Sequence, residues 1–326
     1  MAAPFGLAGG ALRLTEWLAA GFAVYPIAAA GASYQYPGAL GETTDEMRAV
    51  MLEASPALGL TLPHGFSLGA GYRVTAMTMR RYARGARAAQ PGIDVSMSGV
   101  DWRGLRLGAQ WERKWGGARA KRRALMLGLS YRHTVRVPVD GGGGYALAAP
   151  IDHVQTTFVL PARAAAGIRT DYGRFSATLD VDYGLNSQNG RTALDVEFDD
   201  GRSASLPNVF GWQDSWGARG GLEYRALAGE RLPIRVGYAF DGATATPAYP
   251  TAFGPPPTST QMLTCGAGYV AERWRANAAY SYRFGSTQVT EGDVASSEPC
   301  AFCGYPGEYR VQVHGIYLDL SYAFGG

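Results

Sequence analysis

Three groups of residues could act chemically in this sequence, and cysteine is the first. Cys300 and Cys303 form a Cys-x-x-Cys pair, whereas Cys265 stands apart. A zinc site would need a second pair of cysteines or histidines at suitable spacing, and the sequence has none, so we expect neither a metal nor a cofactor. In an oxidising compartment the expected role of the pair is a local disulfide between Cys300 and Cys303, and a redox function is the weaker alternative.

The histidines are the second group, because they could serve as general bases. They are His64, His133, His153 and His314. A hydrolase in a membrane would need a serine, a histidine and an acidic or amide partner. None of the four lies beside a nucleophile motif, so we expect that the protein is not an enzyme.

Arginines recur at alternate positions of several apolar stretches and form the third group. An arginine can hold a carboxylate through two parallel, charge-assisted hydrogen bonds. The arginines that would fall on the polar face of a strand are Arg73, Arg106, Arg132, Arg136, Arg219, Arg225, Arg235 and Arg283. The acids that could pair with them are Glu112, Asp180, Asp182, Glu223 and Asp319. Two interpretations stay open, namely binding of an anionic ligand and a structural ladder of charges.

The elements that would position these groups have a period of two. In the last segment large apolar residues occupy alternate positions, namely Ile316, Leu318, Leu320, Tyr322 and Phe324. Successive side chains of a strand point to opposite faces, so the segment is predicted to be a strand with one apolar face. The same alternation occurs in 105–112, 125–132, 176–183, 232–241 and 276–284. The apolar faces often end in aromatic residues and the polar faces are rich in Gly and Ala, which favours a membrane barrel over a soluble sandwich.

The spacing of these stretches predicts an antiparallel transmembrane β-barrel. We expect about twelve strands, near 16–26, 50–62, 66–78, 93–113, 123–137, 151–171, 174–199, 213–227, 231–242, 259–271, 274–285 and 307–325. Long connections are expected at 27–49, 79–92, 138–150, 200–212, 243–258 and 286–306, and they alternate with short turns. Bacterial barrels have short periplasmic turns and long extracellular loops. The chain is therefore predicted to be one all-β barrel domain, 1–326, with Phe324 near the periplasm.

The composition fits this class and excludes two others. The 326 residues are 47% hydrophobic with a mean hydropathy of −0.11, and no run of about 20 apolar residues occurs, which excludes a helical membrane protein. The net charge of +3 is too small to indicate nucleic-acid binding. The apolar segment 17–32 could be a signal peptide, but Glu16 and Pro26 favour a strand followed by a loop.

Two basic clusters stand out from this weak overall charge. One comprises Arg80, Arg81, Arg84 and Arg87, and the other comprises Arg113, Lys114, Arg119, Lys121, Arg122 and Arg123. They are either solvated loops or contacts with anionic lipid head groups, including the phosphates of lipopolysaccharide.

Five segments, in order along the chain, carry a resemblance to a known family. They are LEASPALGLTLPHGFSLGAGYR (52–73), LMLGLSYRHTVRVPVDG (125–141), FVLPARAAAGI (158–168), the pair formed by 212–227 and 232–247, and VHGIYLDLSYAF (313–324). In this order they resemble the FadL/TodX family of outer-membrane transporters for long-chain fatty acids and aromatic hydrocarbons. The similarity covers most of the chain, and the order of the segments is more specific than any one match.

The resemblance implies a barrel of fourteen strands, plugged by an N-terminal hatch with an Asn-Pro-Ala motif. Neither the hatch nor the motif is visible, and the segment 17–38 is similar to the family's third strand. We therefore expect that the hatch and the first two strands are absent from this sequence. The family's third strand has an inward kink near a glycine, which opens a lateral exit. Gly31 is the best match to that glycine, and an ordinary loop glycine is the alternative.

The resemblance also implies uptake of hydrophobic compounds by capture on loops, binding in the lumen and lateral exit. The connection 243–258 is unusually apolar, and we expect Tyr249 and Phe253 to form a vestibule that its prolines stiffen. The alternative is that this loop simply packs over the barrel mouth.

If the ligand is a fatty acid, its carboxylate needs an arginine. We expect Arg132 and Arg136 to bind it, because both are predicted to face the lumen in the upper half of one strand. Met126 and Phe158 are predicted to line the same cavity.

Two other functions remain open at this point. A general diffusion porin would conduct small ions, and a structural or adhesive barrel would transport nothing. The expected partners are hydrophobic small molecules, outer-membrane lipid and lipopolysaccharide, with no nucleic acid. The chain is expected to be a monomer in the outer membrane.

Overall fold

The computed structural model describes residues 6–115, 123–250, 254–295 and 306–323. In the first part, the strands are β1 (Ala8–Arg13), β2 (Leu18–Gly38), β3 (Gly41–Thr61), β4 (Phe66–Gly85), β5 (Ile93–Trp115), β6 (Arg123–Arg132), β7 (Val135–Gly142), β8 (Tyr145–Ala146) and β9 (Ala149–Leu160). The remaining strands are β10 (Arg163–Tyr172), β11 (Phe175–Gly184), β12 (Arg191–Phe198), β13 (Ser203–Val209), β14 (Ser215–Ala226), β15 (Leu232–Asp241), β16 (Thr260–Val270), β17 (Trp274–Val289) and β18 (Gly307–Tyr322).

Helical structure in the described ranges is limited to short elements. They are the α-helix α1 (Glu291–Ala295) and three single 3-10 turns, at Pro63–Gly65, Asn186–Gln188 and Ala228–Glu230. No helix among the described residues is long and apolar enough to cross a membrane.

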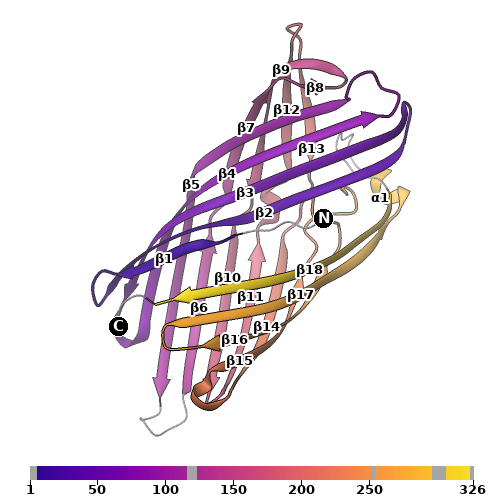
Figure 1. Cartoon of the computed structure of the whole chain (residues 1–326). Coiled ribbons are helices and arrows are strands. Elements are labelled where there is room, and N and C mark those ends of the chain that lie inside the picture. Colours follow the sequence, from indigo (N-terminus) through magenta and orange to yellow (C-terminus); the bar gives the residue numbers. More distant parts are fainter. Residues whose placement is uncertain (1–5, 116–122, 251–253, 296–305, 324–326) are drawn as a thin grey trace.

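The strands pair antiparallel and wind around an interior (Figure 1). Four positions in the wall are each built from two consecutive segments. The first of these positions, next to β5, is shared by β6 and β7, and the second by β10 and β9. The third is shared by β11 and β12, and the fourth, next to β15, by β14 and β13. Strand β1 pairs with β2, and β18 pairs with β17 over sixteen residues, from Trp274↔Tyr322 to Val289↔Gly307. All twelve predicted strand positions contain a strand, which confirms the predicted fold class; β1, β8 and β13 were not predicted.

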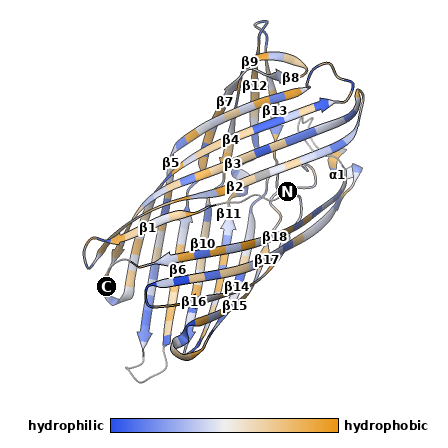
Figure 2. Ribbon diagram, in the orientation of Figure 1, coloured by the Kyte–Doolittle hydropathy of each residue, from blue (hydrophilic) through white to orange (hydrophobic). Residues whose placement is uncertain are grey.

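The two ends of the wall differ in their connections. The end with the short turns, at 62–65, 173–174, 227–231 and 271–273, is called the turn end, and the opposite end is called the loop end. Near the turn end the outward positions are apolar and exposed, for example Leu58, Leu68, Leu129, Leu179 and Leu222. Figure 2 shows the resulting alternation of apolar and polar residues along the strands. A lipid-facing wall requires this pattern, because only apolar side chains avoid a desolvation cost in a bilayer.

At one level of the barrel, called the waist, the backbone of several strands is irregular. The waist divides the wall into a turn half, next to the turn end, and a loop half, next to the loop end. At this level β2 changes register between Pro26 and Ala28, and β4 changes register against β5 between Arg73 and Thr75. Residues 133–134, 161–162, 185–190 and 210–214 interrupt the other long wall strands there. Prolines at positions 26 and 161 contribute, because proline has no N–H to donate to a neighbouring strand.

The waist reverses which residues face inward where a wall position is built from two segments, as in β6 and β7. In β6 the even-numbered residues face the interior, including Met126 and Arg132, whereas Leu127 and Leu129 are exposed on the outside. In β7 the odd-numbered residues Val135, Val137 and Val139 are completely or almost completely buried. The break between the two segments therefore shifts the inward face by one residue.

The loop half, between the waist and the loop end, has an apolar interior. Side chains from β3, β4, β5, β7, β9 and β12 pack there into one core that includes Met51, Met77, Val95, Met97, Val135, Val137, Val139, Ile151, Val154, Val196 and Phe198. Met47, Met79 and Leu160 pack against its edge. Barrel interiors of outer-membrane proteins are usually polar, so this apolar filling is a specific property of the chain.

The strands of the loop half explain why the predicted long loops were partly wrong. The region 27–49 is not a loop, because β2 and β3 continue to a two-residue turn at Ala39 and Leu40. Most of 79–85, 138–142 and 203–209 is likewise strand. In this half the inward face is apolar, and beyond Val50 the outward face of β3 is polar, so the apolar outward face that identified the other strands is missing there. The connection 243–258 is irregular throughout the residues that the structure describes, as expected.

Candidate functional site

The interior at the waist holds a buried ionic cluster around Glu53. The side chains of Glu53 and Arg73 are both 0% exposed, and the Arg73 Nε donates to Glu53 Oε2 at 2.7 Å. Arg106 Nη2 lies 2.9 Å from Glu53 Oε1 and also donates to the Tyr25 hydroxyl at 2.7 Å. Arg73 also donates to the backbone carbonyl of His133, at the break in the wall. The cluster thus ties four wall strands together where their backbone is irregular.

Arg132 lies in the same cluster but differs from its neighbours. It stands directly opposite Arg106 on one adjacent strand and opposite Arg163 on the other. Its Nε is buried without a hydrogen-bond partner, and no carboxylate among the described residues forms a salt bridge with it. We call Arg73, Arg106, Arg132 and Arg163 the arginine cluster. It contains more cations than the two carboxylates that contact it, Glu53 and Asp182, can neutralise.

A ladder of ion pairs continues from this cluster around the interior. Asp182 contacts both Arg163, at 2.9 Å, and Arg219. Asp241 then contacts both Arg219 and Arg283, at 2.7 Å each. Each carboxylate is shared by two guanidinium groups, so the charges of the ladder are largely satisfied within it. These arginines support the structural interpretation offered by the sequence, and Arg132 does not.

A second set of ion pairs lies nearer the turn end. Glu223 accepts from Arg235 at 2.6 Å and from Arg225 at 2.8 Å. Arg169 contacts Asp171 at 3.1 Å. Arg225 and Arg235, which were predicted to face the lumen, and Arg169, which was not, are therefore all paired. This leaves Arg132 as the interior arginine best placed to take an external anion.

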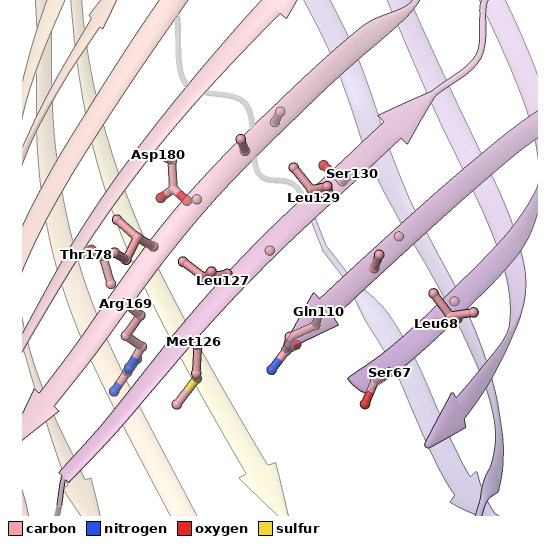
Figure 3. Close-up of a pocket in the computed structure, with 18 residues that line it drawn as sticks. Ser67, Leu68, Gln110, Met126, Leu127, Leu129, Ser130, Arg169, Thr178 and Asp180 are labelled. Atoms are coloured by element: carbon pink, nitrogen blue, oxygen red, sulfur yellow. The ribbon is translucent and has the colours of Figure 1, made fainter. Parts of the chain in front are cut away.

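A cavity of about 540 Å³ lies against the wall of the turn half. Figure 3 shows Ser67, Gln110, Met126 and Arg169 at neighbouring positions of adjacent strands, with their side chains pointing to the same side. Ser130 also lines the cavity, and it is the next inward residue before Arg132 on β6. The arginine cluster therefore lies at the waist edge of this cavity.

The apolar core borders the same cluster on its other side. Along β3 the inward residue next to Glu53 is Met51, and along β4 Thr75 separates Arg73 from Met77. The interior thus passes from apolar side chains to guanidinium groups within about four residues of strand, or roughly 13 Å. An amphiphile with an apolar body and an acidic group matches this order of surfaces.

Two of the predicted ligand contacts are placed differently by the structure. Arg136 does not share the face of Arg132, because the inward face changes at His133 and Thr134; its side chain is exposed and its backbone N–H donates to Asp101. Met126 does line the cavity of the turn half, whereas Phe158 packs against the apolar core of the loop half. Met126 and Phe158 therefore lie on opposite sides of the waist and not in one cavity.

The other predicted residues fall on the wall or outside the described ranges. Gly31 pairs regularly with Arg48, whereas the register shift of β2 lies between Pro26 and Ala28. The ring of Tyr249 lies against Gly211, whose φ of +54° disfavours any other residue. Phe253, Cys300 and Cys303 lie outside the described residues.

Three side chains of this cluster were missed at the sequence level, namely Glu53, Tyr25 and Arg163. Glu53 and Tyr25 lie in apolar stretches, and a lone acid flanked by Leu52 and Ala54 is the signal that was available. A charged side chain in such a stretch is costly unless it is paired inside the protein. No group of His, Cys, Asp and Glu that could hold a metal occurs among the described residues.

Comparison with known proteins gives a likeness of fold. No family model matches the sequence, and no curated protein matches it. The Pseudomonas putida toluene transporter TodX matches with a TM-score of 0.68 at 15% identity, over 98% of this chain and 82% of that one. A Pseudomonas aeruginosa FadL homologue matches with a TM-score of 0.66 at 14% identity, over 97% and 77%. The Ralstonia pickettii toluene transporter TbuX matches with a TM-score of 0.64 at 14% identity, over 97% and 80%.

Proposed function

We propose that this chain, which has the fold of the FadL/TodX outer-membrane channels, is an outer-membrane transporter for hydrophobic compounds. The observation that carries the proposal is the apolar interior of the loop half. A polar solute or ion would lose its hydration there without compensation, whereas an apolar solute would not. Methionines at positions 51, 77 and 97 suit such a path, because their flexible, polarisable side chains adapt to different ligands.

The arginine cluster gives the proposed transporter a preference for amphiphilic acids. Arg132 is the group we assign to the ligand's carboxylate, since it is partly buried, unpaired among the described residues and flanked by two further cations. The apolar body of the ligand would lie toward Met51 and Met77. Long-chain fatty acids and aromatic carboxylic acids both satisfy this description.

Entry and exit are assigned to irregular parts of the wall. Entry is proposed at the connection 243–258, although Ala245 and Pro250 are already buried and Tyr249 packs on Gly211, so capture would require this loop to open. Lateral exit is proposed at the register shift between Pro26 and Ala28, which adjoins the pairing of Tyr25 with Glu53. A bulge locally removes pairing and weakens the wall at one point.

Uptake by cells tests the proposal. A strain lacking the gene is compared with the same strain expressing the chain, using a radiolabelled long-chain fatty acid and a radiolabelled aromatic hydrocarbon. We expect faster uptake of at least one of them in the expressing strain. Equal uptake of both compounds in the two strains would remove the basis of the transporter assignment.

A matched pair of variants tests the role of Arg132. Arg132→Gln removes the inward cation, and loss of one charge-assisted interaction of about 1.5–3 kcal/mol should weaken binding of a fatty acid roughly 10- to 100-fold. Arg136→Gln, four residues along and facing outward, should leave binding unchanged. Uptake of a neutral hydrocarbon should change in neither variant. Equal effects of the two substitutions would refute the assignment of Arg132.

A general diffusion porin is the second candidate, and the packed apolar core argues against it. Small-ion conductance of the purified chain in planar bilayers distinguishes the two. Conductance typical of an open water-filled pore would favour the porin.

A further inference from the structure

The outward face of β3 and β4 changes from uncharged to charged side chains toward the loop end. On β3 the outward residues Leu52 and Val50 are apolar and exposed, and the next outward residue toward the loop end is Arg48. On β4 Arg80 lies directly opposite Arg48 in the register. Two arginines therefore stand side by side on the outside of the barrel, one outward position beyond Val50 on β3 and beyond Thr78 on β4.

This arrangement is unfavourable for the isolated protein. Like charges directly opposite each other on adjacent strands repel and destabilise the pair. No salt bridge to Arg48 is formed by any residue that the structure describes. Arg80, whose side chain is 64% exposed, has only a loose contact with Asp94, at 3.6 Å.

The neighbouring residues leave both guanidinium groups accessible. Gly31 lies opposite Arg48 on β2, and Ser96 lies opposite Arg80 on β5. Neither residue is large enough to cover an arginine side chain. The acids Glu46 and Asp94 lie one step closer to the loop end, so an anion would reach the arginines from the membrane side.

We propose that Arg48 and Arg80 together bind a phosphate group of lipopolysaccharide. The inference rests on the proposed outer-membrane location, where lipopolysaccharide forms the outer leaflet. Its phosphates lie at the border between acyl chains and sugars, which corresponds to the border between Val50 and Arg48 on this wall. Paired guanidinium groups match a phosphate well, because each presents parallel donors to its oxygens.

Binding of lipid vesicles by the purified full chain tests the inference. Vesicles containing lipid A are compared with vesicles of phosphatidylethanolamine alone, for the wild type and for Arg48→Gln, Arg80→Gln and the double variant. We expect each single substitution to weaken binding to lipid A about fivefold, which is the effect of ~1 kcal/mol per cation near an anionic surface. The double variant should bind about 25-fold more weakly, and binding to the zwitterionic vesicles should not change.

Arg123→Gln is the matched control. Arg123 also faces outward and lies beside the ring of Tyr172, but at the turn end, which is the opposite border of the apolar surface. Its substitution should leave binding to lipid A unchanged. Unchanged binding by the double variant, or an equal loss in Arg123→Gln, would overturn the inference.

Thermal unfolding in detergent free of lipopolysaccharide provides a second readout. Because Arg48→Gln removes a repulsive pair, we expect the variant to be at least as stable as the wild type while its binding to lipid A falls. A clear drop in stability would assign Arg48 a structural role and overturn the inference. Uptake of hydrophobic compounds is measured separately, so normal uptake with unchanged lipid A binding would remove only this inference and not the proposed transport.

Discussion

Replacing Glu53 with alanine should destabilise the barrel far more than removing an exposed acid. Glu53 is the carboxylate that balances Arg73, and both side chains are 0% exposed. Removing one partner of a buried ion pair leaves an uncompensated buried charge, which costs about 3–5 kcal/mol. This corresponds to a shift of roughly two to four powers of ten in the unfolding equilibrium.

Glu308→Ala provides the control for this change. Glu308 pairs with Arg310 at 2.6 Å, but the two side chains are 51% and 59% exposed. An exposed pair contributes about 0–1 kcal/mol, because water solvates both charges when the pair is broken. The two variants thus remove the same chemical group from a buried pair and from an exposed pair.

The assay is equilibrium unfolding in urea, in lipid or detergent, followed by tryptophan fluorescence and by the mobility shift of the folded barrel on gels. Glu53→Ala should lower the unfolding midpoint strongly, and Glu308→Ala should hardly change it. The double variant Glu53→Ala with Arg73→Ala should recover part of the loss, since no unpaired cation then remains at position 73. The reasoning fails if Glu53→Ala costs no more than Glu308→Ala, or if the double variant is no more stable than Glu53→Ala.

Three further outcomes follow from the packing of the wall. Met77→Ala should lower the free energy of unfolding by about 2–5 kcal/mol, because Met77 is 2% exposed in the apolar core. Leu318→Ala, at an 81% exposed outward position, should lower it much less, and similar losses in the two variants would contradict the core assignment. Cys265 lies between Val236 and Tyr280 on the outward face of the barrel. It should therefore react with a lipid-soluble maleimide but not with a charged one, and rapid labelling of Cys265 by the charged reagent would disprove this. Replacing Val137 with serine should raise small-ion conductance in planar bilayers by making the core more polar, and no change would show that this core does not block ions.

The turn half of the wall was predictable because its outward face is apolar and its inward face is polar. This contrast produces the period of two that located strands such as β11 and β15. In the loop half the contrast is reversed, with Met47 and Ala49 facing inward and Arg48 facing outward. Because the alternation of large apolar and polar side chains is weak in 27–49, this region was predicted to be a loop, although it belongs to two long strands.

The arginines were only partly predictable for a different reason. Alternation along an uninterrupted strand places Arg132 and Arg136 on the same face, and the sequence carries no clear sign of the break at His133 and Thr134. The break shifts the inward face to Val135 and turns Arg136 outward. The pairing of Arg73 and Arg106 with Glu53 also depends on contacts between residues far apart in the sequence, which alternation does not specify.

The most direct test of the proposed function uses the purified chain in liposomes. Influx of an apolar aromatic compound is measured beside influx of a sugar of similar size, with empty liposomes as the background. An interior closed by apolar side chains predicts influx of the aromatic compound above background while the sugar stays at background. Influx of the sugar above background, with no added influx of the aromatic compound, would contradict it.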